Sequence, residues 1–282
     1  MSGPPPVTAV RTVGRAERVT WTSLGPGRGG IACAVHTRQL GPAMAGLATL
    51  ARGSSDQAVA VAMARAEQTT LAAVTAGAPV GGAAVVLLGT ADAATPRDIA
   101  DVLDGLDGDV VLVPELGEHA DLARSAAAHT AFVADPGVDV AADGIAEVAA
   151  GAWSEITGGQ GLGGVRVAVV GGRDYGVRIA RAAAARGAVA VHTPWSPPLP
   201  SADVLIAATA DGRTAEDTLR LDCRLLVAAV GGPMDDEAVW RAMVARGVEC
   251  VPGSVALGPL LRAAAAIAAP EPARRGSRPR QG

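Results

Sequence analysis

Hydrophobic positions in the first half of the chain form short runs of strand length, separated by helical patterns. The runs lie at residues 18–23, 29–36, 83–89 and 109–117. The first two flank a Gly/Pro turn, which predicts a β-hairpin. An Ala-rich helical pattern covers 54–77 with N-cap candidates at Ser54 and Ser55, and another helix is expected after Thr95-Pro96. Strands that alternate with helices predict an α/β domain.

The second half has the pattern of a nucleotide-binding fold. The chain changes domain near 135–137, and a helix is expected at 140–156. Residues 167–194 then read as strand, helix and strand, which is typical of a βαβ unit. Further apolar runs lie at 203–209, 224–230 and 248–253, before a last helical pattern at 255–269.

We therefore predict an α/β protein with two domains. The first is an N-terminal α/β substrate-type domain at 19–136, and the second is a C-terminal Rossmann-like doubly wound domain at 137–269. Residues 1–18 and the Arg-rich residues 270–282 are expected to form a disordered arm and a disordered basic tail.

The glycine motif of the βαβ unit is incomplete. Gly171 and Gly176 take the first and third glycine positions of a dinucleotide fingerprint, but Arg173 takes the middle one. The second strand, which should end in an acidic residue for the ribose, ends at Pro194. Arg173 is interpreted either as a clamp for a phosphate or as a side chain that fills a lost cofactor site; the missing acid favours the second.

Composition narrows the classes of function. Of the 282 residues 49% are hydrophobic but only 2% aromatic, so the cores must consist of Ala, Val and Leu. A net charge of −4 gives no attraction to nucleic acid or membranes. No secretory signal or membrane-spanning stretch is visible, and three cysteines without metal spacing predict a cytoplasmic protein with no metal site. The sequence contains no lysine, which excludes any mechanism that needs a lysine amine.

One family resemblance spans about residues 19–262. The stretch GGIACAVHTRQLGPAMAG (29–46) resembles the leucine/phenylalanine/valine branch of the amino-acid dehydrogenases, the relatives of glutamate dehydrogenase. TTLAAVTAGAPVGGAAVVLLG (69–89) continues this resemblance in register with the family's lysine-bearing helix and strand. Looser matches follow at PELGEH (114–119), AADG (141–144), DVLIAATADG (203–212), VAAVGGPM (227–234) and VPGSVALG (251–258).

The resemblance implies where the family's chemistry would lie. The lysine that clamps the substrate carboxylate is Ala72 here, and the lysine that activates water is Ala84. Glu115 stands at the place of the catalytic Asp, and the Asn pair near the nicotinamide becomes Gly231-Gly232. The implied substrate pocket consists of Met44, Gly46, Ala72, Ala84 and Val255.

Few acid–base groups remain. Glu115 is the leading catalytic candidate, with His119 one helical turn further on. Glu118 and His119 have a structural alternative as the exposed start of a helix, and His36 is expected to be structural. Tyr175, the only tyrosine, is expected at the surface.

Three functions stay open. We favour a catalytically degenerate homologue, a pseudo-dehydrogenase without NAD that acts as a partner or regulatory subunit. The alternatives are a repurposed cofactor-independent enzyme (cyclisation, dehydration or isomerisation of a small metabolite in specialised metabolism) with Glu115 as acid or base, and an atypical NAD(P)-dependent amino-acid dehydrogenase or imine reductase.

Cofactors and partners follow from the same interpretation. No cofactor is expected, or NAD(P) if the redox alternative holds. The chain ends soon after the last matching segment, where the family continues with further helices. We therefore expect a homo-oligomer or a hetero-oligomer with a paralogous subunit that covers apolar surface, and a small-molecule ligand is possible.

Overall fold

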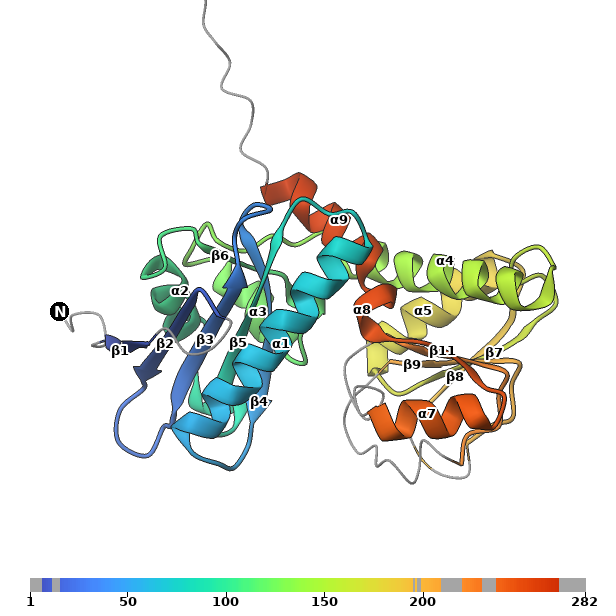
Figure 1. The fold of residues 1–282 in the computed structure, drawn as a ribbon, viewed down its shortest axis with the longest axis horizontal. Helices are drawn as coiled ribbons and strands as arrows, with labels where there is room; N and C mark the ends of the chain where they lie inside the picture. Colours follow the sequence, from blue (N-terminus) through green and yellow to red (C-terminus); the bar gives the residue numbers. More distant parts are fainter. Residues whose placement is uncertain are drawn as a thin grey trace, which may run out of the picture.

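The computed structural model describes residues 7–11, 16–194, 196, 199–208, 220–229 and 237–268, and of 7–11, Arg173 and Glu237 it describes the backbone alone. The expected tail at 270–282 and the Gly231-Gly232 pair lie outside these residues. Figure 1 shows two lobes, which correspond to the expected α/β architecture with a Rossmann-like second half.

The first lobe contains a mixed six-stranded sheet in the order β1-β2-β3-β5-β4-β6. Its strands are β1 (Val7–Arg11), β2 (Arg18–Ser23), β3 (Gly30–Thr37), β4 (Ala43–Leu50), β5 (Gly81–Leu88) and β6 (Val110–Leu112). β2 and β3 form the expected hairpin, and β4 lies parallel between β5 and β6.

Two strands of this sheet were not anticipated. Residues 7–11 pair antiparallel with β2, so this part of the expected disordered arm is a strand. β4, with the sequence AMAGLATL, has few of the branched or aromatic residues that mark strands. Hydrogen bonding to β5 on one edge and to β6 on the other holds β4 extended.

Helices cover both faces of the first sheet. The longest, α1 (Ser55–Thr75), begins at a capping box formed by Ser54 and Gln57, and packs its buried alanines on one face. On the other face lie α2 (Pro96–Asp104), which is capped by Thr95, and α3 (Ala120–Ala126). Two 3-10 turns, η1 (Ala91–Ala93) and η2 (Pro114–Leu116), follow β5 and β6.

The second lobe contains a parallel five-stranded sheet in the order β11-β10-β9-β7-β8. Its strands are β7 (Arg166–Val170), β8 (Val189–Thr193), β9 (Val204–Ala207), β10 (Leu225–Ala228) and β11 (Glu249–Val251). α4 (Val138–Thr157) and α5 (Arg173–Ala185) pack on one face, and α7 (Glu237–Ala245) packs on the other. The strand order reverses at β7, so a topological switch point lies beside the glycine loop that follows this strand.

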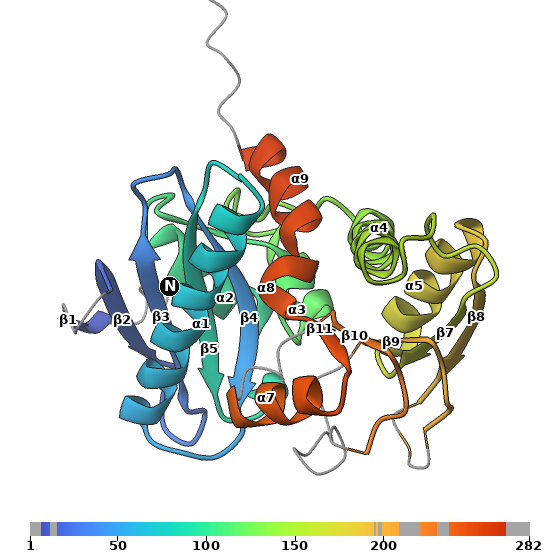
Figure 2. The ribbon, with the colours of Figure 1, turned by 45° about the vertical axis from the view of Figure 1, so that its right-hand side comes forward.

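The last helical pattern, expected as one helix at 255–269, is two helices. α8 (Gly253–Ala256) ends before Leu257, and α9 (Gly258–Ala268) begins with Gly258-Pro259. α9 packs against the first lobe, where Leu260 and Leu261 share a core cluster with Met44. Figures 1 and 2 both place α8 and α9 between the lobes, beside α1. None of the helices in the described part of the chain could cross a membrane.

The contact between α1 and β5 leaves no room for a side chain at Gly82. A Cβ there would overlap the backbone of Ala66 and Thr70 on α1. We expect Gly82→Ala to lower the free energy of unfolding by about 1–3 kcal/mol, because the helix must move off the sheet. Chemical denaturation of the purified variant measures this loss.

Gly151→Ala is the matched control. Gly151 lies inside α4, and a Cβ there would meet nothing within 4 Å. This variant should gain about 0.5–1 kcal/mol, because alanine has the higher helix propensity. Equal effects at the two glycines would contradict the close packing described for Gly82.

Candidate functional site

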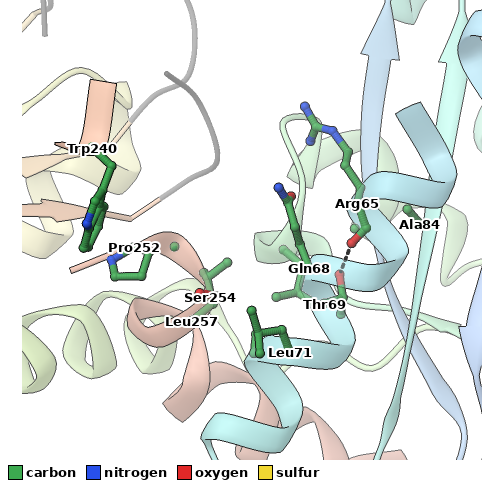
Figure 3. A pocket seen from close by; sticks show the side chains of 13 residues that line it. Arg65, Gln68, Thr69, Leu71, Ala84, Trp240, Pro252, Ser254 and Leu257 are labelled. Atoms are coloured by element: carbon green, nitrogen blue, oxygen red, sulfur yellow. Dashed lines mark hydrogen bonds between the residues drawn. The ribbon is translucent and has the colours of Figure 1, made fainter. Parts of the chain in front are cut away.

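A cavity of about 360 Å³ lies between the two lobes. The first lobe contributes Gly46, Ala84, Leu116 and one face of α1, and the second contributes Trp240 and the segment around α8. Figure 3 shows Arg65, Gln68 and Leu71 on α1 opposite Trp240, Pro252 and Ser254. The lining residues are Gly46, Arg65, Gln68, Thr69, Leu71, Ala72, Ala84, Leu116, Trp240, Pro252, Gly253, Ser254 and Leu257.

Some members of the predicted substrate pocket line this cavity. Gly46, Ala72 and Ala84 do, from β4, α1 and β5. Met44 instead lies in the core cluster beneath α1 and α9. Val255 is 37% exposed on α8, whereas its neighbours Ser254 and Leu257 line the cavity. Ser254 and Leu257 are three residues apart and share a helix face, from which Val255 points away.

Close backbone packing fixes the floor of the cavity. A Cβ on Gly46 would overlap the carbonyl of Leu116, and one on Gly117 would overlap the backbone of Leu47. The η2 turn therefore lies directly on β4, and this contact places the Leu116 side chain at the cavity wall.

The α1 face carries the polar groups that sequence reasoning missed. Arg65 pairs with Glu118 at 2.5 Å, and its side chain is 35% exposed. Glu118 also accepts a 3.3 Å hydrogen bond from the backbone N–H of Thr49, and the His119 ring lies 3.1 Å from the Thr49 hydroxyl. His119 is the N-cap residue of α3. Because Glu118 and His119 both contact Thr49 on β4, their side chains belong to one network beside the cavity.

Glu115 lies in a buried network rather than on the cavity wall. Its side chain is 3% exposed and forms an ion pair with Arg124, and Oε2 is buried without a hydrogen-bond partner among the described residues. The same arginine donates from Nε to Asp135 at 2.8 Å, where the chain passes between the lobes. Burial raises the pKa of Glu115 above the ordinary glutamate value, although the Arg124 charge acts to lower it.

Tyr175 is not at the surface as expected. Its hydroxyl is buried without a partner in the described part of the chain, and its ring packs against the core clusters of both lobes. Burial, with a smaller contribution from the Glu115 charge, raises the pKa of this hydroxyl. The unpartnered oxygens of Glu115 and Tyr175 therefore both belong to the junction between the lobes.

The glycine loop after β7 keeps part of a dinucleotide site. Gly171 and Gly172 have positive φ, and a Cβ on Gly176 would overlap the Gly171 carbonyl and the His192 ring. The His192 Nε2 lies 2.9 Å from that carbonyl. The backbone N–H groups that begin α5 suit a phosphate.

At the end of β8 the described residues have no counterpart of the acidic side chain that binds the ribose. β8 ends at Thr193, Pro194 follows, and neither residue has a carboxylate for ribose hydroxyls. Arg173 begins α5, but its side chain is outside the described part of the structure. The described loop thus has backbone N–H groups that suit a phosphate, and β8 with Pro194 offers no carboxylate to a ribose. The described residues also contain no group of three or more His, Cys, Asp or Glu that could hold a metal ion.

Solved structures of amino-acid dehydrogenases have the same architecture. The chain is similar to L-tryptophan dehydrogenase from Nostoc punctiforme, with 18% identity, a TM-score of 0.62, and coverage of 87% of this chain and 80% of that one. The hetero-hexameric glutamate dehydrogenase from Thermus thermophilus (Leu bound form) gives 18% identity and a TM-score of 0.62, over 92% and 75% of the two chains. The fold is that of the amino-acid dehydrogenases.

A third neighbour agrees with these two. Glutamate dehydrogenase from Peptoniphilus asaccharolyticus is 13% identical with a TM-score of 0.58, and the match covers 91% of this chain and 76% of that one. No protein-family model matches the chain, and no curated protein matches its sequence. At these identities the likeness establishes the fold alone.

The raised pKa of Glu115 predicts a specific pH dependence. Because the folded state favours the protonated carboxyl, wild type should lose stability relative to Glu115→Gln as pH rises from about 4.3, the ordinary glutamate pKa. Each unit by which the pKa is raised lowers the free energy of unfolding by about 1.4 kcal/mol once the pH exceeds the raised pKa of the folded state. Urea denaturation of both proteins from pH 4 to 7 measures the difference, and a wild-type advantage that grows with pH would contradict it.

Proposed function

We propose that the chain is a catalytically degenerate homologue of the amino-acid dehydrogenases that acts, without NAD, as a cytoplasmic partner or regulatory subunit. In this role the cavity between the lobes serves to bind a small molecule rather than to transfer a hydride. Glu115 and the glycine loop around Gly171, Arg173 and Gly176 are then structural elements.

The observation that carries the proposal is the pair of alanines in the cavity. Ala72 and Ala84 lie on facing elements, α1 and β5, and both line the cavity at the positions that the resemblance assigns to catalytic lysines. Methyl groups there cannot clamp a carboxylate or take up a proton. Arginine is not an equivalent substitute, because its guanidinium stays protonated at physiological pH.

A partner role is supported by the kind of assembly known for this fold. The neighbour from Thermus thermophilus is hetero-hexameric and was solved in a Leu bound form. A chain with a retained cavity and altered chemistry could serve in such an assembly by binding a ligand for an active subunit. An obligate partner would also cover apolar side chains that this chain exposes, such as Val74 and Ile267.

One observation supports the repurposed-enzyme alternative. A buried carboxyl with a raised pKa and a free oxygen is a common signature of a general acid, and Glu115 has both properties. Against it, Glu115 does not line the cavity, whereas its neighbour Leu116 does. The alternative therefore requires a rearrangement around Leu116 before a ligand in the cavity reaches the carboxyl. The atypical NAD(P) dehydrogenase or imine reductase has less support, because the ribose acid is missing at Pro194.

Dinucleotide binding separates the proposal from the redox alternative. A ligand that binds the folded state must raise the melting temperature by mass action. We expect NAD and NADP, each at millimolar concentration, to leave the melting temperature unchanged, and we expect no reduction of either by leucine, phenylalanine or tryptophan. The tryptophan dehydrogenase from Nostoc punctiforme is the positive control for both assays, and NAD turnover by this chain would overturn the proposal.

The partner role is tested by reconstitution. The chain would be co-expressed with each intact amino-acid dehydrogenase from its own organism, and light scattering would measure the mass of any complex. We expect one pair to form a stable hetero-oligomer whose dehydrogenase rate differs at least twofold from that of the active subunit alone. Separate elution of every pair, with unchanged rates, would contradict it.

A further inference from the structure

The cavity carries a single charged side chain among its described lining residues, that of Arg65. We propose that this cavity binds a small organic carboxylate that has an apolar or aromatic body and no ammonium group, with the carboxylate held by Arg65. This inference rests on the proposed function, because it names the ligand class of the same cavity.

Arg65 has donors available for an anion. In the described part of the chain its Nη2 donates to Glu118 at 2.5 Å, and its Nε and Nη1 have no protein partner. A guanidinium presents donors in a planar fork that suits the two oxygens of a carboxylate. The network with Glu118 and Thr49 holds the side chain at the rim, which reduces the entropy lost when an anion binds.

The position of Arg65 fixes the orientation of the ligand. Arg65, Thr69 and Ala72 follow one another at spacings of four and three residues, so they share one face of α1. Ala72 is thus about 10 Å along the helix axis from Arg65. A carboxylate at Arg65 would direct the rest of the ligand toward the methyl groups of Ala72 and Ala84.

The remaining wall suits an apolar body with few polar contacts. Leu71, Leu116 and Leu257 contribute aliphatic surface, and Trp240 contributes an aromatic ring from the opposite lobe. The hydroxyls of Thr69 and Ser254 and the amide of Gln68 are neutral. Thr69 already donates its hydroxyl to the Arg65 carbonyl at 3.0 Å.

The same lining argues against an α-amino acid. An ammonium group in a partly desolvated cavity needs an acceptor with negative charge. The lining residues in the described ranges include no carboxylate. The nearby Glu118 is paired with Arg65, and Glu115, which is paired with Arg124 through one oxygen, does not line the cavity. Because the described lining residues offer an ammonium no counter-charge, we expect the cavity to discriminate against the zwitterion of the same shape.

The test uses two probes that differ at one group. Isothermal titration would compare 3-phenylpropanoate with L-phenylalanine, which has the same body and carboxylate plus an α-ammonium. We expect 3-phenylpropanoate to bind the wild-type chain at least tenfold more tightly than phenylalanine. Failure of 3-phenylpropanoate to bind, or equal affinity for the two probes, overturns the inference.

Variants locate the binding. Arg65→Gln should weaken 3-phenylpropanoate binding by about 10- to 100-fold, the loss expected for charge-assisted hydrogen bonds. Glu118→Gln should strengthen it, because the glutamine amide oxygen can still accept the hydrogen bond that positions Arg65 while the competing negative charge is removed. Arg97→Gln removes an equally charged but exposed side chain on α2 and should leave the affinity unchanged.

The outcomes separate this inference from the proposed function. Unchanged binding in Arg65→Gln, or weaker binding in Glu118→Gln, overturns the role of Arg65 even if dinucleotides still fail to bind. Turnover with NAD overturns the proposed function but leaves the measured preference between the two probes intact. The melting temperature of each variant verifies that it is folded. Because Glu118→Gln is expected to raise the affinity for 3-phenylpropanoate, a loss of folding cannot imitate its result.

Discussion

The near-contact of two backbones, that of α1 and that of β5, is the constraint on which the rest of the molecule depends. Gly82 and the alanines of α1 allow the helix to lie directly on the strand, where larger side chains would separate them. With aromatic residues at only 2% of the chain, stability must come from close packing of small groups over a large area.

The junction between the lobes uses longer side chains and polar contacts. Arg124 joins Glu115 to Asp135, where the chain leaves the first lobe, and Tyr175 packs against the cores of both. α9 then returns to the first lobe, with Gly258 close against Ala76. Tyr175 and α9 thus connect the lobes from separate parts of the sequence, and the Arg124 network fixes the point where the chain leaves the first lobe. Glu115, a catalytic candidate from the sequence, is part of this network.

Local signals in the sequence were sufficient for much of the fold. Ser54 and Thr95 cap helices that begin where their side chains can accept backbone N–H groups, and the βαβ unit follows from its glycines and apolar runs. β4 was not predicted, because its small residues have low strand propensity and its extended conformation depends on pairing with β5 and β6. The break before Pro259 was hidden inside a continuous apolar pattern.

The site was predictable in part for a similar reason. The resemblance indicated Gly46, Ala72 and Ala84, which line the cavity, because each lies in a short segment whose glycines align with the family pattern. Arg65 gave no such signal, since a lone arginine on a long helix usually lies on a solvated face. Its spacing from Ala72 gains meaning only when the opposite lobe, with Trp240, closes the cavity. Tyr175 was misplaced because exposure depends on the packing of two lobes rather than on the glycine loop itself.

The chemistry proposed for the cavity depends on the alanines at positions 72 and 84, which both line it. Two lysines in such a cleft would each need desolvation and a counter-charge, and would provide a proton acceptor at the reacting atom. Two methyl groups instead leave an apolar floor, with Arg65 at the rim as the one cation among the described lining residues. Charge-assisted binding is then available at one end of a ligand, and the described lining residues include no titratable group opposite its other end. The lining thus pairs one cation at the rim with an apolar interior, which is the arrangement that the proposed carboxylate ligand requires.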